Sequence, residues 1–202
     1  MSMTENRRML AGLLYNPFLV ESSWNIAREA VKRFNDSEFW KNDDALRELK
    51  KIFAAVGEDV VLTPPFYCDH GSKITFGDHF YANTGLLILD ENNVTFGNRV
   101  FLSPHVSIYT AGHPIDAAVR ATGLEYAKPV HIGNDVWIGG NVVINPGVTI
   151  GDDVVIGSGS VVTKDIPGHS VAAGNPCRVI RCIEDKDRSY WEMQLHEYQN
   201  TY

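Results

Sequence analysis

Apolar residues in the C-terminal half of the chain recur every six positions. Two columns of aliphatic residues carry this period: Ile132, Ile138, Ile144, Ile150, Ile156 and Val162, together with Val130, Val136, Val142, Val148 and Val154. Glycine follows the first column at positions 133, 139, 151 and 157. A weaker copy of the pattern lies upstream, at Phe76-Gly77, Phe96-Gly97, Leu102 and Ile108, with a two-residue slip between Ile88 and Phe96.

This period predicts a coil of short strands. Within one unit Val136 and Ile138 are expected to point inward and Trp137 outward, which is the two-residue alternation of a strand. The Gly, Asn, Asp and Pro residues that follow each strand turn the chain, and we expect left-handed backbone conformations at these corners. A helix of 3.6 residues per turn cannot keep a six-residue period, and the strands of an ordinary β-sandwich repeat at ~8–12 residues. Successive turns of the coil should therefore stack by parallel pairing and bury the aliphatic columns.

The N-terminal part of the chain has a helical pattern instead. Apolar residues recur at helical spacing in the stretches 24–34 and 46–56. The second stretch follows Asn42-Asp43-Asp44, which suits the start of a helix, and ends before Gly57. We expect residues 1–60 to form a helical cap that covers the open strand edges at one end or side of the coil.

The coil is expected over residues 61–183, with one long interruption. The pattern lapses over residues 109–129, which we interpret as an extruded loop with His113 at its root. Long irregular loops in a repetitive fold usually carry function. Residues 184–202 mix charges with aromatic side chains, which indicates a tail or short helix packed on the outside.

Composition and charge narrow the function classes. The 202 residues carry 18 Lys and Arg against 25 Asp and Glu, a net charge of −7, which disfavours nucleic acid and anionic membranes as partners. No apolar run reaches the ~18 residues of a membrane-spanning helix, and the first residues lack the apolar core of a signal peptide. The three cysteines form no Cys-x-x-Cys motif. We therefore expect a cytoplasmic protein with reduced thiols.

Several local motifs resemble the hexapeptide-repeat sugar O-acetyltransferases, in particular the maltose and galactoside O-acetyltransferases. The resemblance covers nearly the whole chain and rests on segments that accompany the hexapeptides: Met-Leu-Ala-Gly-Leu-Leu-Tyr-Asn at 9–16, Thr-Ala-Gly-His-Pro at 110–114, Val-Trp-Ile-Gly-Gly at 136–140, Asn-Pro-Gly-Val-Thr-Ile-Gly at 145–151, Val-Thr-Lys-Asp-Ile-Pro at 162–167 and Gly-Asn-Pro-Cys-Arg at 174–178. It implies a mainly β fold, a left-handed parallel β-helix, assembled as a homotrimer with active sites between subunits. It also implies direct acetyl transfer from acetyl-CoA to a sugar hydroxyl in a ternary complex, without a metal.

The resemblance assigns the catalytic roles to two residues. A sugar hydroxyl is a weak nucleophile, so a base must take its proton as it attacks the thioester, and histidine suits this role near neutral pH. His113 resembles the catalytic histidine of the family; from the residues alone, a histidine that caps a turn is an equal alternative. Alternation points Tyr81 and Asn83 outward. Asn83 resembles the asparagine that contacts the acceptor and stabilises the transition state.

Further residues are matched to substrate and coenzyme contacts. The acceptor contacts implied are Asn16, Asp69, Tyr81, Asn83 and Glu91, and Glu125 would either orient His113 or bind a hydroxyl. Two positions depart from the family, which often has Tyr-Asp where this chain has Tyr15-Asn16, and serine in the galactoside branch where it has Asp69. The coenzyme contacts implied are Gly140, Ser158, Thr163, Lys164, Arg178 and Arg181. The other histidines, including His70, are interpreted as surface or turn residues.

Other interpretations stay open at this stage. The acceptor is a maltose, glucose or galactoside type of sugar, or a xenobiotic alcohol. A zinc enzyme of the carbonic-anhydrase kind shares the coil but needs three clustered histidines, and His105 and His113 are spaced out of phase with the repeat. A non-catalytic scaffold is a third possibility. The exposed Trp137 would contact either a neighbouring subunit or the coenzyme.

Overall fold

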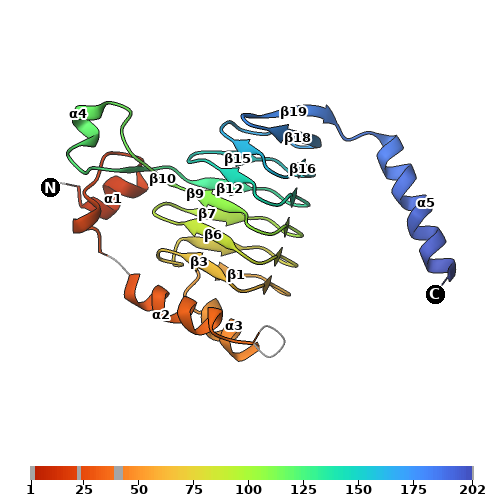
Figure 1. The fold of residues 1–202 in the computed structure, drawn as a ribbon, viewed down its shortest axis with the longest axis horizontal. Coiled ribbons are helices and arrows are strands. Elements are labelled where there is room, and N and C mark those ends of the chain that lie inside the picture. Colours follow the sequence, from red (N-terminus) through yellow and green to blue (C-terminus); the bar gives the residue numbers. More distant parts are fainter. Residues whose placement is uncertain (1–2, 22–23, 39–42, 202) are drawn as a thin grey trace.

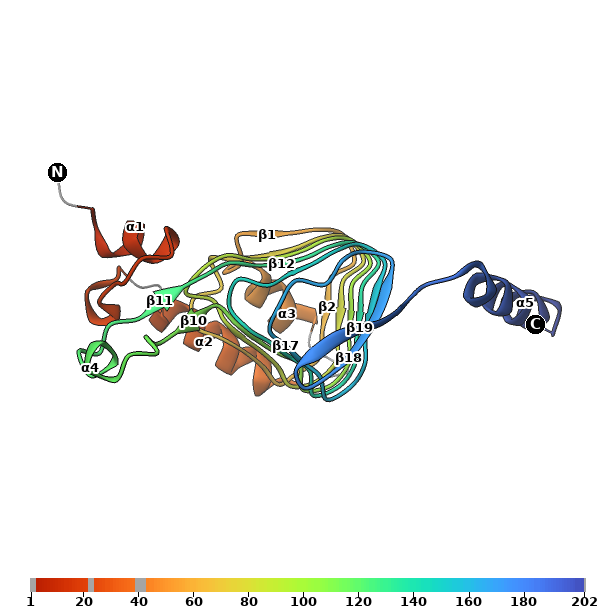
Figure 2. The same cartoon turned by 90° about the horizontal axis from the view of Figure 1, so that it is seen from above.

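The computed structural model describes residues 3–21, 24–38 and 43–201, and three sheets form the sides of a prism (Figures 1 and 2). Each turn of the chain adds one strand to each sheet. The first sheet comprises β1 (Ala55–Val56), β4 (Ile74–Phe76), β7 (Val94–Phe96), β12 (Val130–Ile132) and β15 (Thr149–Ile150). The predicted mainly β coil with N-terminal helices and a C-terminal helix is confirmed.

The other two sheets complete the prism. The seven-stranded sheet comprises β2 (Val61–Leu62), β5 (Tyr81–Ala82), β8 (Phe101–Leu102), β13 (Trp137–Ile138), β16 (Val154–Ile156), β18 (Ser170–Gly174) and β19 (Cys177–Cys182). The third sheet comprises β3 (Phe66–Cys68), β6 (Leu86–Leu89), β9 (Ser107–Tyr109), β14 (Val143–Ile144) and β17 (Val161–Val162). Neighbouring strands in these sheets are parallel, except that β19 returns antiparallel to β18 and ends the stack.

The interior of the prism contains the predicted aliphatic columns. Ile132 pairs in register with Phe96 and Ile150, so each column residue stacks on the one in the next turn. Every residue of the two columns is at most 3% exposed. At the N-terminal end the filling becomes aromatic, and the rings of Phe76 and Phe96 stack with centroids 5.2 Å apart. The columns are therefore the continuous core of the coil.

The expected left-handed corners are confirmed in part. Left-handed backbone occurs at corner residues such as Asp135, Asn141 and Gly147, whereas the glycines that directly follow the column do not adopt it. Those glycines are needed for close approach instead. A Cβ on Gly133 would lie 2.8 Å from the carbonyl carbon of Gly151 in the next turn, and one on Gly139 would lie 2.6 Å from Ser158 N. The chain turns so tightly here that adjacent backbones leave no room for a side chain.

Two helices close the N-terminal end of the prism. α2 (Trp24–Asn35) buries Ala27, Val31 and Phe34, and its last residue, Asn35, exchanges two 2.8 Å hydrogen bonds with the backbone of Phe66 at the edge of the third sheet. α3 (Asp43–Lys50) ends earlier than its apolar spacing predicts, because Ala55–Val56 pairs with β4 as the first strand of the coil. Asn42, the predicted start, lies outside the described residues.

The N-terminal arm and the interrupting loop lie together at the side of the prism (Figure 2). The arm contains α1 (Glu5–Leu10) and a 3-10 helix, Pro17–Leu19. The loop is more ordered than an irregular excursion: β10 (Ala111–Gly112) and β11 (Tyr126–Ala127) pair antiparallel, and the short helix α4 (Ala117–Arg120) forms the tip. Backbone hydrogen bonds join Tyr15 to Glu125 in both directions, so the arm extends this hairpin.

The C-terminal segment is helical, as predicted, but does not pack on its own chain. α5 (Asp185–Thr201) has no buried residue, and it projects away from the prism in Figures 1 and 2. The expectation of a helix packed on the outside is therefore wrong for the single chain. No helix within the described ranges is both long enough and apolar enough to span a membrane.

Candidate functional site

The residues predicted to form the site fall on two different corners of the prism. We call the corner between the third and first sheets the loop corner; it contains Asp69 after β3, Glu91 after β6 and the loop with His113 after β9. We call the corner between the seven-stranded and third sheets the second corner; it contains Asn83 after β5, Gly140 after β13 and Ser158 after β16. One sheet separates the two corners within a single chain.

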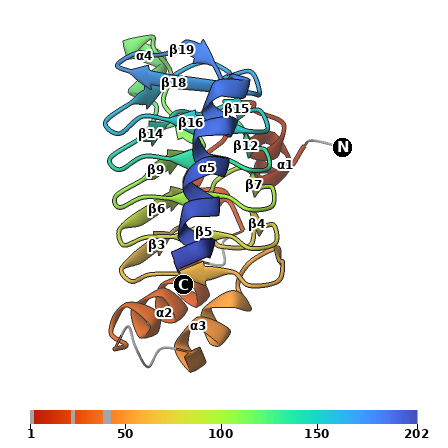
Figure 3. The ribbon, with the colours of Figure 1, turned by 90° about the vertical axis from the view of Figure 1, so that its right-hand side faces the viewer.

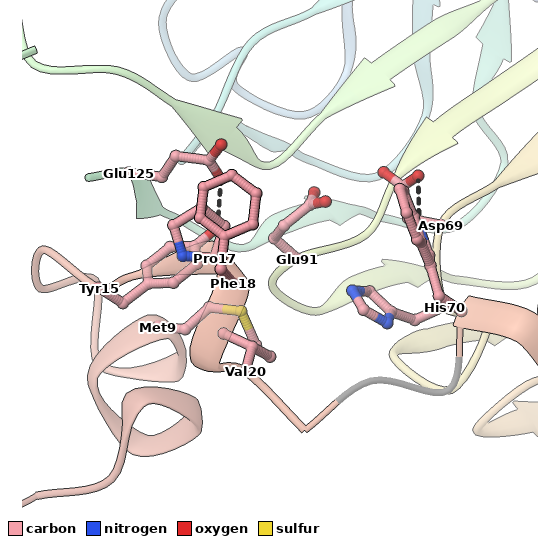
Figure 4. A pocket seen from close by; sticks show the side chains of 10 residues that line it. Met9, Tyr15, Pro17, Phe18, Val20, Asp69, His70, Glu91 and Glu125 are labelled. Carbon is pink, nitrogen blue, oxygen red and sulfur yellow. Dashed lines mark hydrogen bonds between the residues drawn. The ribbon is translucent and has the colours of Figure 1, made fainter. Parts of the chain in front are cut away.

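A cavity of about 440 Å³ lies between the N-terminal arm and the loop corner (Figure 4). Asp69 and His70 lie on one side of it, and on the other side the side chains of the N-terminal arm are mostly apolar and lie next to Glu125. The lining residues are Met9, Tyr15, Pro17, Phe18, Val20, Trp24, Asp69, His70, Glu91 and Glu125. A cavity with polar groups on one wall and apolar side chains on the other suits a sugar ring, which has hydroxyl edges and apolar faces.

His113 lies beside this cavity and faces Glu125. His113 Nε2 is 3.9 Å from Glu125 Oε1, with the histidine side chain 57% exposed and the glutamate 22% exposed. The other carboxylate oxygen of Glu125 accepts a 2.8 Å hydrogen bond from the hydroxyl of Tyr15, which is itself buried. Burial and the hydrogen bond to Glu125 raise the pKa of Tyr15, so this hydroxyl stays protonated and donates. The arm thus holds Glu125 in front of the imidazole.

The carboxyl wall contains three acidic residues close to one another. Asp90 is fully buried, and its Oδ1 accepts the backbone N–H groups of Asp69 and His70 at 3.0 and 2.9 Å. Burial raises the pKa of Asp90 to about 6, and burial together with the charge of Asp69 raises the pKa of Glu91 to about 8. Asp90 Oδ2 and Glu91 Oε2 are shielded from solvent and accept no hydrogen bond from the described residues. The raised pKa favours the protonated form of Glu91, which can donate as well as accept a hydrogen bond.

His70 was interpreted from the sequence as a surface or turn residue, and the structure corrects this. Its side chain lines the cavity and is only 7% exposed. Burial, with the nearby charge of Lys73, lowers the pKa of His70 to about 4, so the imidazole is neutral at neutral pH. Trp24, also missed, donates from Nε1 to Asp69 Oδ1 at 3.1 Å. No sequence pattern links Trp24 or Tyr15 to the coil, because their partners lie 45 and 110 residues away.

Asn16 has a structural partner in the single chain. Its Oδ1 accepts from Phe18 N at 3.0 Å and thereby caps the 3-10 helix, and Asn16 is not among the residues that line the cavity. The sugar contact that the resemblance implies for Asn16 stays a prediction.

The second corner presents Asn83 and Tyr81 away from the core. Phe80 and Ala82 are fully buried while Tyr81 and Asn83 are half-exposed, which confirms the predicted alternation. Asn83 Oδ1 accepts from Thr84 N at 2.8 Å, which leaves its amide nitrogen available to a ligand. Neither residue lines the cavity at the loop corner.

The predicted coenzyme contacts are spread over the C-terminal turns of the coil. Gly140 and Ser158 follow one another along the second corner, whereas Thr163 and Lys164 follow β17 at the loop corner. Arg178 donates to Cys177 O at 2.7 Å. Arg181 is engaged in two hydrogen bonds to the carboxylate of Asp187, at 2.6 and 3.0 Å. Within residues 3–21, 24–38 and 43–201, no group of three or more His, Cys, Asp or Glu side chains has the arrangement of a metal site.

Comparison with known proteins identifies the family. The bacterial transferase hexapeptide model matches residues 129–164, and the maltose acetyltransferase capping motif matches residues 8–57. Galactoside O-acetyltransferase of Escherichia coli is 45% identical over 194 residues, which is 95% of each chain. The chain belongs to the hexapeptide-repeat acetyltransferases. It is accordingly an acyltransferase.

Solved structures of this acetyltransferase family superpose along nearly the whole chain. A galactoside acetyltransferase in complex with coenzyme A has a TM-score of 0.89 at 44% identity, over 93% of this chain and 94% of the other. A maltose O-acetyltransferase from Clostridium difficile 630 has a TM-score of 0.86 at 45% identity, over 91% of this chain and all of the other. The capping motif covers most of the N-terminal arm, which lines the cavity, together with α2 and α3, which close the end of the prism.

Proposed function

We propose that this protein transfers the acetyl group of acetyl-CoA to a hydroxyl of a sugar, of the maltose, glucose or galactoside type. The observation that carries the proposal is the cavity beside His113, which is lined by the carboxyl groups of Asp69 and Glu91 and by apolar side chains of the N-terminal arm. Relatives named as galactoside and maltose O-acetyltransferases, one of them bound to coenzyme A, support both the acceptor class and the acetyl donor.

In the proposed mechanism His113 acts as the general base. The imidazole takes the proton of the acceptor hydroxyl while that oxygen attacks the thioester carbonyl carbon; the C–S bond then breaks and the proton passes to the departing thiolate. Glu125 stabilises the imidazolium that forms, because its carboxylate faces Nε2. Asn83 donates from its amide to the oxyanion of the tetrahedral intermediate. The acetyl group moves directly from the thioester to the acceptor oxygen in a ternary complex, and burial, which raises the pKa of the Cys68 thiol, disfavours that residue as a thiolate nucleophile.

The separation of the two corners supports active sites between copies in a homotrimer. His113 and Asn83 lie on different corners, so a site that uses both needs the loop corner of one copy against the second corner of its neighbour. The coenzyme would lie along that seam, with its arm beside Gly140 and Ser158 and its phosphates near Thr163, Lys164, Arg178 and Arg181. Heterologous contacts that close into a ring generate such a trimer.

The test measures CoA release from acetyl-CoA across maltose, glucose, galactosides and hydroxyl-bearing antibiotics. We expect turnover with at least one sugar, and a His113→Ala variant that folds but loses roughly 10²–10⁴-fold in activity. Near-normal turnover of this variant would exclude His113 as the base. Turnover only with antibiotics would move the acceptor class to xenobiotic alcohols, and failure to bind CoA in a calorimetric titration would favour a scaffold.

A subunit-mixing experiment tests the shared sites. His113→Ala and Asn83→Ala copies, each inactive alone, are mixed and allowed to exchange. If every site takes one residue from each of two copies, random assortment restores activity at about a quarter of the sites. A mixture that stays inactive after proven exchange would contradict sites shared between copies.

A further inference from the structure

The C-terminal helix α5 is surrounded by solvent in the single chain although its sequence is rich in large apolar side chains. Trp191, Leu195 and Tyr198 follow one another at i, i+4 and i+7, so they form one stripe along the helix. All three are more than half exposed, and Tyr190 packs edge-on against the Trp191 ring of its own helix. Helices of this length depend on tertiary packing for most of their stability. In the single chain more than half of each side chain in the stripe is left to solvent, and packing against a partner would stabilise the helix.

The direction of α5 is set by contacts at its first turn. Asp187 accepts two hydrogen bonds from the guanidinium of Arg181 on β19 and a third from the backbone N–H of Glu184 at 2.9 Å. This brace fixes the helix to the last strand of the coil. Figures 2 and 3 show the result: α5 stands beyond the outer face of the seven-stranded sheet and runs along the direction in which the turns stack.

The sheet face opposite α5 also carries exposed apolar side chains. Its register aligns one outward residue from each turn, a set we call the outer ladder: Val61, Tyr81, Phe101, Trp137, Val155 and Val171. Val61, Phe101 and Trp137 are among the exposed large hydrophobic residues of the chain. With strands ~4.8 Å apart, six turns span about 24 Å, and the 17 residues of α5 span about 25 Å. The space between the sheet and α5 is therefore flanked along its whole length by the outer ladder on one side and by the helix on the other.

We propose that α5 is an arm that clasps a second copy of this chain, seated between the outer ladder and the Trp191–Leu195–Tyr198 stripe. The proposal places the stripe on the side of α5 that faces the sheet, so that a single body in that space covers both apolar surfaces. The inference rests on the assembly proposed above, because the outer ladder includes Tyr81 and adjoins Asn83, the side of the chain that needs a neighbour to complete a site.

The chain offers a matched pair of substitutions to test the arm. Leu195 and Met193 are exposed to similar extents, 54% and 56%, but Met193 lies on the side of α5 opposite the stripe. The rate at which tagged and untagged copies exchange is measured by native mass spectrometry for wild type, Leu195→Ser, Trp191→Ser, Phe101→Ser and Met193→Ser. We expect at least tenfold faster exchange for Leu195→Ser, Trp191→Ser and Phe101→Ser, and less than a twofold change for Met193→Ser.

Hydrogen exchange of the α5 amides identifies the occupant. Protection that rises with protein concentration, as copies assemble, supports the arm. Protection that is independent of concentration would place α5 on its own chain, and rapid exchange of α5 in the assembled protein would show that it is uncovered. Either of these results would overturn the inference. Equal effects of Leu195→Ser and Met193→Ser, or a protein that never assembles, would also overturn it. Acetyl transfer is assayed in parallel, so an active enzyme with an unprotected α5 refutes only the arm, and a clasped assembly without transfer refutes only the activity.

Discussion

Replacing Glu125 with glutamine removes a negative charge beside His113 and keeps the size of the side chain. Glu125 Oε1 lies 3.9 Å from His113 Nε2, and the amide oxygen of glutamine can still accept the hydrogen bond from the Tyr15 hydroxyl. The backbone bonds between residues 15 and 125 are untouched. The substitution therefore deletes the attraction between the carboxylate and the imidazolium that forms when His113 takes a proton.

The geometry sets the size of the effect. Two unit charges 3.9 Å apart attract by about 1 kcal/mol in bulk water and about 4 kcal/mol at an effective dielectric constant near ~20. Because His113 is 57% exposed and Glu125 22% exposed, solvent screening places the interaction in the lower half of this range, at about 1–2 kcal/mol. The imidazolium exists only as transfer proceeds, so the loss affects the transition state. We expect kcat to fall about 5- to 30-fold with little change in KM.

Steady-state CoA release at saturating acetyl-CoA and varied acceptor separates the two parameters. Asp116→Asn provides the control, because Asp116 lies in the same loop and caps α4 by accepting from Val119 N, a role that asparagine also fills. We expect less than a twofold change in that variant. An unchanged kcat in Glu125→Gln, or a raised acceptor KM at constant kcat, would refute the electrostatic role and make Glu125 a contact to a sugar hydroxyl instead.

Three further substitutions test the N-terminal arm, the carboxyl wall of the cavity and the glycine corners of the coil. Tyr15→Phe removes the donor to Glu125 and should lower the free energy of unfolding in urea by about 1–2 kcal/mol, with a smaller loss of kcat than Glu125→Gln. An unchanged free energy of unfolding would show that the hydrogen bond contributes nothing to stability. Folding raises the pKa of Glu91 from 4.5 to about 8, so the folded state holds the extra proton and the free energy of unfolding falls as pH rises between these values. In Glu91→Gln, urea titrations between pH 5 and 8 should show most of this pH dependence gone. If the free energies of unfolding of the variant and the wild type change in parallel with pH, the assignment is contradicted. Gly133→Ala places a Cβ 2.8 Å from the Gly151 carbonyl carbon and should cost about 1–3 kcal/mol in thermal unfolding, whereas an unchanged melting temperature would mean that the corner relaxes freely.

The repeat region could be predicted almost completely from the sequence. A strict six-residue period of aliphatic residues has one physical solution, a coil of short strands, and the inward and outward directions of Phe80, Tyr81 and Ala82 follow from alternation alone. The role of the corner glycines was predicted less well. Sequence indicates that glycine is required at Gly133 but not whether for backbone conformation or for the approach of the next turn, and the structure assigns the second reason.

Some features of the site could be predicted from the sequence, and others could not. His113 and Asn83 could be singled out because the motifs around them resemble the family, whereas spacing alone left a turn-capping histidine equally possible and favoured an ordinary corner asparagine. Their placement on two corners, the burial of His70 in the cavity, and the hold of Tyr15 on Glu125 could not be read from any window of the chain.

For this protein the sequence alone determined what depends on local periodicity: the coil, its buried columns, the cap, the interrupting loop and the helical character of the tail. Tertiary structure decided what depends on contacts between distant segments. The cavity exists because the N-terminal arm pairs with a loop 110 residues away, and the exposed position of α5 follows from the Arg181–Asp187 brace that directs it away from its own coil. Periodicity specifies which face of a strand is buried, whereas only folding in three dimensions specifies which side chains meet.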